Sequence, residues 1–169
     1  MDYIPYPTKG YAAELSVGQK GFTKSMNAFQ VSVKGSGYWP TGRRSFFNVN
    51  VFGTIKAPFD QTYYNRRLLG YSNVFMQGYE YYVVDGVAGG YLKAAYTRKL
   101  ANFKINFNGT KKIAPLRIPI NIYGRVYGNT GYVYDTKPGE NSLANKWLFS
   151  SGVGIDIVTI YDFVFKLDW

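Results

Sequence analysis

The chain has 169 residues, and its 20 Lys and Arg outnumber its 10 Asp and Glu, so its formal net charge is +10. It contains no Cys and no His, which excludes disulfides, thiol chemistry and the residue type that most often serves as general base or metal ligand. No stretch of the sequence approaches the ~20 apolar residues of a membrane-spanning helix, and the basic residues are too dispersed to predict a nucleic-acid partner.

Seven segments of the chain alternate between apolar and polar residues, which predicts β-strands with one apolar and one polar face. The clearest run is Phe29-Gln-Val-Ser-Val-Lys34. Turn-forming residues separate the segments, including an expected Pro-Thr-Gly turn at Pro40–Gly42. The expected strands cover Gly10–Gly21, Asn27–Trp39, Ser45–Lys56, Gly86–Asn102, Leu116–Tyr134, Lys146–Ile160 and Asp162–Trp169.

Two long connections, Ala57–Asp85 and Thr136–Asn145, contrast with a tight one at Tyr161–Asp162. Long loops at one rim, short turns at the other and an outward apolar face are typical of outer-membrane β-barrels. The 17 Tyr and 3 Trp suit a membrane–water interface. We therefore expect an all-β fold in the bacterial outer membrane, an antiparallel transmembrane β-barrel segment that occupies residues 1–169 as a single domain.

The strand count conflicts with a closed barrel of this kind. Bacterial single-chain barrels have an even number of strands, and at least eight. An open sheet of seven strands would leave two unpaired edges in hydrocarbon. Either the count is one short, or the seven segments are part of a larger barrel.

Three segments of the chain carry a family resemblance. The connection over residues 57–85 contains Met76-Gln77-Gly78-Tyr79, and Tyr127-Gly-Asn-Thr-Gly131 and Ser151-Gly-Val-Gly-Ile-Asp156 follow it. In this order and spacing they resemble the sixth loop and two later wall elements of the outer-membrane barrel-assembly insertase and two-partner-secretion transporter superfamily. The Tyr-rich composition is most similar to bacterial surface antigens of that superfamily from Bacteroidetes.

The resemblance implies a sixteen-stranded barrel, of which this chain would supply strands nine to fifteen, about seven or eight strands. It also implies peptide-binding repeats upstream and a closing strand after Trp169, so we expect an incomplete C-terminal half barrel. A competing interpretation is that Phe165-Lys-Leu-Asp-Trp169, which ends in an aromatic residue, is the terminal insertion signal. The implied partners are outer-membrane lipid, unfolded β-barrel client proteins, accessory periplasmic or lipoprotein subunits and the remainder of the barrel.

The chain departs from the superfamily at the loop motif, where Gln77 replaces an arginine that folds into the lumen. In the superfamily this arginine contacts an acidic or aromatic patch on the wall, and here Asn129 stands at the wall position. We infer that a neutral amide–amide hydrogen bond replaces an ion pair, which avoids stranding a buried charge. The alternative is that Gln77 only decorates a loop tip. The expected lumenal wall residues are Arg125, Tyr127, Asn129, Gly131 and Asp156, with Arg117 and Asn121 on the same face.

The implied function is non-enzymatic and needs no cofactor. The protein would assist insertion, assembly or translocation of other proteins at the outer membrane, with the loop bracing the lumenal wall. The alternative is a passive porin or a small closed outer-membrane barrel. A third class, a lipid-modifying enzyme with eight strands, is disfavoured because no His is present to activate a Ser.

Overall fold

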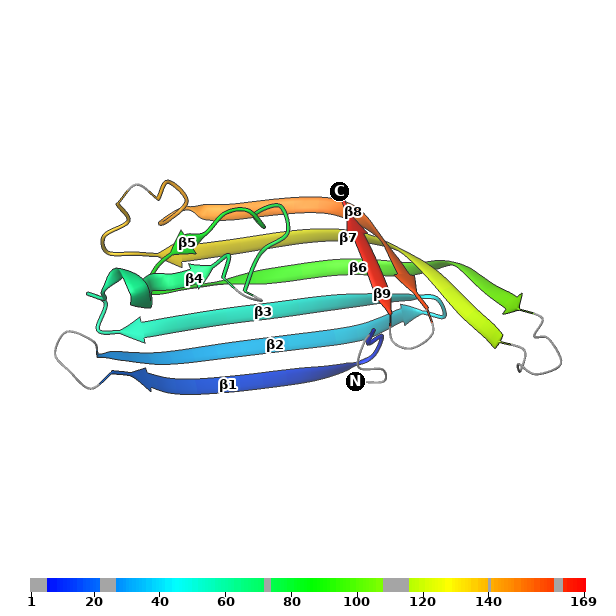
Figure 1. Cartoon of the computed structure of the whole chain (residues 1–169), viewed down its shortest axis with the longest axis horizontal. Coiled ribbons are helices and arrows are strands. Elements are labelled where there is room, and N and C mark those ends of the chain that lie inside the picture. The colour runs from blue at the N-terminus through cyan, green and yellow to red at the C-terminus, as the bar shows by residue number, and fades with distance from the viewer. Residues whose placement is uncertain (1–5, 22–26, 72–73, 108–115, 140, 160–162) are drawn as a thin grey trace.

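A computed structural model of the chain describes residues 6–21, 27–71, 74–107, 116–139, 141–159 and 163–169. Its main feature is one antiparallel sheet of seven strands in the order β1-β2-β3-β6-β7-β8-β9 (Figure 1). The expected all-β, antiparallel fold is therefore confirmed. The strands are β1 (Gly10–Lys20), β2 (Ala28–Gly42), β3 (Ser45–Ala57), β6 (Ala88–Phe107), β7 (Leu116–Tyr134), β8 (Trp147–Val158) and β9 (Val164–Asp168).

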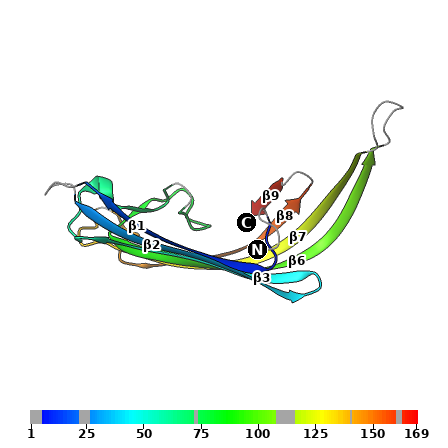
Figure 2. The ribbon, with the colours of Figure 1, turned by 90° about the horizontal axis from the view of Figure 1, so that it is seen from below.

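The sheet is curved like a trough, and the loop between β3 and β6 lies on its concave side (Figure 2). Alternation places most apolar residues of the strands on the convex face. In the register, Val31 is opposite Ile55 and Val51 is opposite Leu92, so their side chains share that face. The intervening polar residues line the concave face, as the sequence predicts.

The two ends of the sheet differ in their connections (Figure 1). One end, which we call the loop rim, carries the connections over residues 58–87 and 135–146. The opposite end, which we call the turn rim, carries the two-residue turn Arg43–Arg44 between β2 and β3. The expected tight connection at Tyr161–Asp162 lies outside the described residues.

The expected turn at Pro40–Gly42 is wrong, because these residues continue β2 and the turn follows at Arg43–Arg44. Pairing of β1 with β2 ends at Tyr38, so Pro40 lies where β2 has no neighbour on that side. A proline there removes no ladder hydrogen bond. The register shift between Pro40 and Gly42 absorbs the irregularity.

The fourth expected strand is also too short, because β6 continues from Asn102 to Phe107. Together with β7 it extends past both neighbours at the turn rim. Pairing with β3 stops at Arg98, and pairing of β7 with β8 stops at Asn121. The remainder of β6 and β7 therefore forms a two-stranded ribbon that projects beyond the sheet (Figure 2).

The sheet does not close on itself, since β1 and β9 are its two edges. Ten of the eleven residues of β1 are exposed, with only Gly10 partly covered. Among the described residues, none forms a helix with the length and apolar character of a membrane-spanning helix.

Candidate functional site

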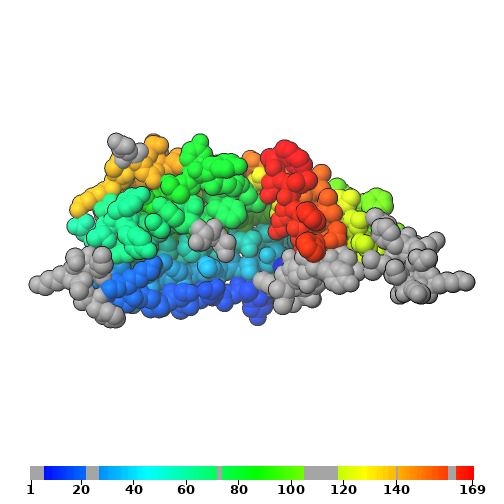
Figure 3. Space-filling view, viewed as in Figure 1, coloured from blue at the N-terminus to red at the C-terminus, as the bar shows by residue number. Residues whose placement is uncertain are grey.

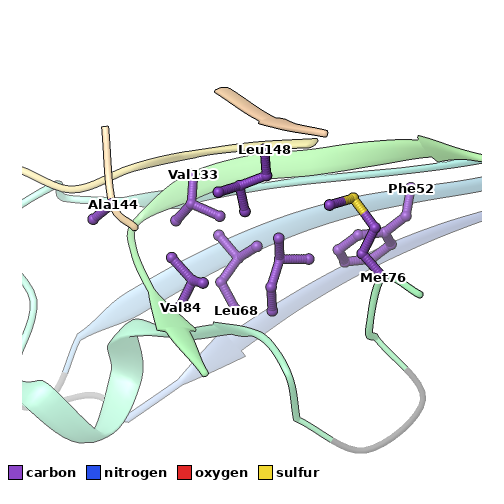
Figure 4. Close-up of a cluster of buried hydrophobic side chains, with 8 residues drawn as sticks. Phe52, Leu68, Met76, Val84, Val133, Ala144 and Leu148 are labelled. Atoms are coloured by element: carbon purple, nitrogen blue, oxygen red, sulfur yellow. The ribbon is translucent and has the colours of Figure 1, made fainter. Parts of the chain in front are cut away.

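The connection between β3 and β6 folds back onto the concave face instead of extending outward. It contains a 3-10 helix, η1 (Tyr63–Arg66), and a short pair of strands, β4 (Arg67–Leu69) and β5 (Val84–Asp85). Its apolar side chains form a cluster with residues of the sheet and of the neighbouring connection (Figure 4). The buried members are Phe52, Leu68, Leu69, Met76, Val84, Val133, Ala144 and Leu148.

Polar contacts fix the base of this loop. Lys56 is almost fully buried, and its ammonium donates to the carbonyl oxygens of Asn65 at 2.8 Å and Arg67 at 2.6 Å. The guanidinium of Arg66 donates to the carbonyl of Lys137 at 2.9 Å and lies 3.7 Å from a carboxylate oxygen of Asp135. These bonds join the loop to its own strand β3 and to the connection that follows β7.

The loop motif reaches the wall where the sequence predicts. Asn129 Nδ2, on β7, donates to Gln77 Oε1 at 3.2 Å. The same nitrogen donates to Ser150 Oγ, on β8, at 3.1 Å. The expected amide–amide hydrogen bond is therefore confirmed, and the alternative of an unattached loop tip is wrong. Asn129 is only 5% exposed, so this contact is shielded from water.

The neighbouring motif residues each have a packing reason for their identity. Met76 is 1% exposed, and a Cβ built on Gly131 would stand 3.3 Å from its sulfur, so the glycine makes room for the methionine. Gly78 has φ +85, and a Cβ there would be 3.1 Å from Cβ of Ser150. The Tyr79 hydroxyl donates to the carbonyl of Phe149 at 3.3 Å. The whole motif is thus fitted against β7 and β8.

A second polar network lies on the concave face near the turn rim. The Arg125 guanidinium forms an ion pair with Asp156 at 3.1 Å and another with Asp168. The Tyr6 hydroxyl, from the segment before β1, donates to Asp156 Oδ2 at 2.8 Å. Burial and then the charge of Asp156 raise the pKa of Tyr6 above its usual range, so the phenol stays protonated and can donate. Tyr127 joins the network by donating to the carbonyl of Trp169 at 3.4 Å.

A cavity of about 670 Å³ lies between the two networks. The loop and β9 both stand on this side of the sheet (Figure 3). Gln77 and Glu80 line one side of the cavity, Lys166 and Asp168 line the other, and Lys93 is among the residues of its floor. The cavity therefore carries both signs of charge.

All nine residues expected at the site lie on the concave side, but in two groups. The loop motif meets Asn129 and Gly131, whereas Arg125, Tyr127 and Asp156 belong to the network around Tyr6. Sequence reasoning missed Ser150 and Tyr6. For Ser150 the missing information was the register between β7 and β8, which local alternation does not contain.

In the part of the chain that the structure describes, no group of acidic residues could hold a metal ion. Comparison of the chain with protein-family models, with curated proteins and with solved structures finds no match.

Proposed function

We propose that this chain is part of the wall of an outer-membrane β-barrel that assists insertion, assembly or translocation of other proteins. The observation that carries the proposal is the loop folded onto the concave face, with Gln77 hydrogen-bonded to Asn129. An inward loop tied to the wall braces a barrel from inside. No enzymatic step is needed for this role.

The convex face supports a membrane location. Near the turn rim Trp39, Phe47 and Tyr96 are opposite one another in the register and exposed. Near the loop rim the exposed aromatics of the convex face include Phe29, Tyr134 and Trp147. Between the two aromatic rows lie the exposed aliphatic residues Val33, Val51 and Leu92, with Phe149 in register with Leu92 through Thr130.

The spacing of the two rows matches a bilayer. Phe29 and Trp39 stand near opposite ends of β2, ten positions apart. Ten steps of about 3.4 Å, inclined by about 40°, cover about 26 Å, against the ~25 Å apolar band of outer-membrane barrels. Tyr and Trp at both ends of such a band are typical of interfacial girdles.

The number of strands supports a larger barrel rather than closure by this sheet alone. In an antiparallel sheet of seven strands the first and the last run in the same direction, so β1 and β9 would meet in parallel. Antiparallel closure therefore needs an odd number of additional strands. Nine more would make the sixteen strands of the superfamily that the loop motif resembles.

The mechanism would need a braced wall and an exposed strand edge. The loop motif holds β7 and β8, and a weak lateral seam of the larger barrel would supply the edge. A client strand would pair with an exposed edge through backbone hydrogen bonds, which give affinity with little dependence on client sequence. Unfolded β-barrel proteins are the partners that fit, and accessory periplasmic subunits would deliver them.

Depletion of the full-length protein tests this function. We expect the amounts of other folded outer-membrane barrels to fall, measured by their heat-modifiable mobility in membrane fractions. Unchanged amounts of those barrels after depletion would refute the assembly role.

A second function, a passive pore, is favoured by one observation. The cavity of about 670 Å³ is lined by both acidic and basic side chains, as a solute path would be. Planar-bilayer recordings of the full-length protein distinguish the two functions. Steady conductance with defined solute selectivity, together with normal levels of other barrels after depletion, would establish the pore.

A further inference from the structure

Three arginines gather on the turn rim just beyond its aromatic row. Arg43 and Arg44 form the turn between β2 and β3, and Arg98 is paired with Ser45 beside that turn. The Arg44 carbonyl accepts a hydrogen bond from the backbone of Lys99 at 2.7 Å, which holds the turn against β6. All three arginine side chains are exposed.

None of these three guanidinium groups has a protein partner among the described residues. The four ion pairs there involve other cations, and the guanidinium groups of Arg43, Arg44 and Arg98 form no hydrogen bond or ring contact. The sequence also provides few acids for them. No Asp or Glu occurs between Glu14 and Asp60 or between Asp85 and Asp135. Within the described residues, the positive charge of these three arginines is therefore unpaired.

The arginines of the loop rim, Arg66 and Arg67, and also Lys137 have protein partners instead. Arg66 meets Asp135, and Lys137 meets Asp60 at 2.8 Å, a hydrogen bond that lowers the pKa of Asp60. Arg67 lies over the ring of Tyr64 at 4.9 Å from its centroid. The arginines without protein partners are thus specific to the turn rim, and the basic composition of the chain does not by itself explain them.

The neighbouring aromatic row shows what the arginines lie beside. On the convex face Arg98 follows Tyr96 by two positions on β6, so both side chains point outward. Trp39 lies flat over Gly37, since a Cβ there would stand 2.3 Å from its ring, and is 6.4 Å from Phe47 between ring centroids. An arginine just outside an aromatic girdle stands at the depth of the lipid phosphates.

We propose that Arg43, Arg44 and Arg98 form a binding site for anionic phospholipid headgroups at the rim of the membrane-spanning wall. Guanidinium groups bind phosphate oxygens in a bidentate manner, and basic residues at a membrane surface attract anionic lipid. This inference rests on the membrane location in the proposed function but not on the assembly role.

The position of the site on the turn rim indicates phospholipid rather than lipopolysaccharide as its ligand. In outer-membrane barrels short turns face the periplasm and long loops face outward. The Arg43–Arg44 turn is the short type, and the connection with η1, β4 and β5 lies at the opposite rim. The periplasmic leaflet is built of phospholipid, so an acidic headgroup such as phosphatidylglycerol is the expected ligand.

Native mass spectrometry of the purified full-length protein, titrated with phosphatidylglycerol or phosphatidylcholine, tests the site. The variant R43Q/R44Q/R98Q should weaken phosphatidylglycerol binding by on the order of fivefold per arginine and leave phosphatidylcholine binding unchanged. The matched control K20Q/K137Q/K146Q removes three exposed charges at the loop rim. It should keep the wild-type preference for phosphatidylglycerol.

Each other outcome overturns the site. Unchanged phosphatidylglycerol binding by R43Q/R44Q/R98Q refutes it. Equal weakening of that binding in the control variant indicates an effect of net charge alone. Tighter binding of purified lipopolysaccharide contradicts the assigned leaflet. Should R43Q/R44Q/R98Q fold poorly, R43K/R44K/R98K keeps the charge and should lose part of the preference, and full retention would refute bidentate binding. Recovery of the full-length protein in soluble fractions would instead overturn the membrane location.

Discussion

The connections at the loop rim and at the turn rim of the sheet place their arginines in opposite surroundings. At the loop rim Lys56 and Arg66 bind carbonyl and carboxylate oxygens of the fold, and the connection packs over an apolar cluster. At the turn rim Arg43, Arg44 and Arg98 bind nothing in the described chain. Lys56 and Arg66 therefore stabilise the fold, whereas Arg43, Arg44 and Arg98 are available for binding.

The first test of this comparison removes the central apolar contact of the loop. Met76→Ala should destabilise the packed loop by about 2–5 kcal/mol, because the buried side chain leaves a cavity. Limited trypsin digestion of the full-length protein, followed at the bonds after Arg66 and Arg67, measures the loss of protection. R43Q/R44Q/R98Q is the control and should leave the digestion rate unchanged. Equal rates for wild type and Met76→Ala would mean that the loop is not held by this cluster.

A backbone change at the motif should have the next largest effect. Gly78→Ala forces a side chain into a backbone with φ +85 and against Ser150. The expected cost is about 1–2 kcal/mol of loop stability. Gly139→Ala is the matched control, since that glycine has φ +56 but nothing within 4 Å of its added Cβ. If the two variants lose similar amounts of stability, the loss in Gly78→Ala comes from backbone strain alone and not from the contact with Ser150.

The amide pair should contribute less. A double-mutant cycle with Gln77→Ala and Asn129→Ala measures the coupling between the two side chains, expected at about 0.5–1.5 kcal/mol for a neutral hydrogen bond. Loop protection from trypsin again supplies the free energies. If the effects of the two single substitutions simply add in the double variant, Gln77 and Asn129 do not interact directly.

The smallest expected effect is a pH dependence at alkaline pH. Tyr71 donates to Asp85 at 2.8 Å, and burial together with this bond raises the pKa of Tyr71 from its ordinary 10.0 to about 12. A raised pKa means that the stabilisation is complete below pH ~10 and is lost as the pH rises through ~12. Loop protection should therefore fall over this interval and fall less in Tyr71→Phe. An identical decline in both proteins would place the pH dependence elsewhere.

The sequence predicts the strands well because alternation is a local property. All seven expected strands are present, and Leu116–Tyr134 has the expected bounds. The errors occur where a strand loses a neighbour. Pro40 resembles a turn residue, and Asn102 is a polar residue in a ribbon that no other strand flanks. Whether a neighbouring strand is present depends on the whole sheet, so no local pattern contains it.

The site is predictable in part for the same reason. Alternation on β7 places Asn129 on the concave face, and the loop motif indicates Gln77 as its partner. Ser150 joins them only through the register of β7 with β8. Tyr6 lies outside every expected strand, so neither alternation nor the motif predicts its contact with Asp156.

The hydrogen bond from Tyr6 to Asp156 has a consequence for the order of folding. Its partners are 150 positions apart along the chain. Contacts between distant positions form late, because the intervening chain must first be ordered. Asp156 becomes available only when β7 and β8 have paired. We therefore expect the segment around Tyr6 to become protected from proteolysis after the sheet does. The hydrogen bond of the Tyr6 phenol would then mark the end of sheet formation.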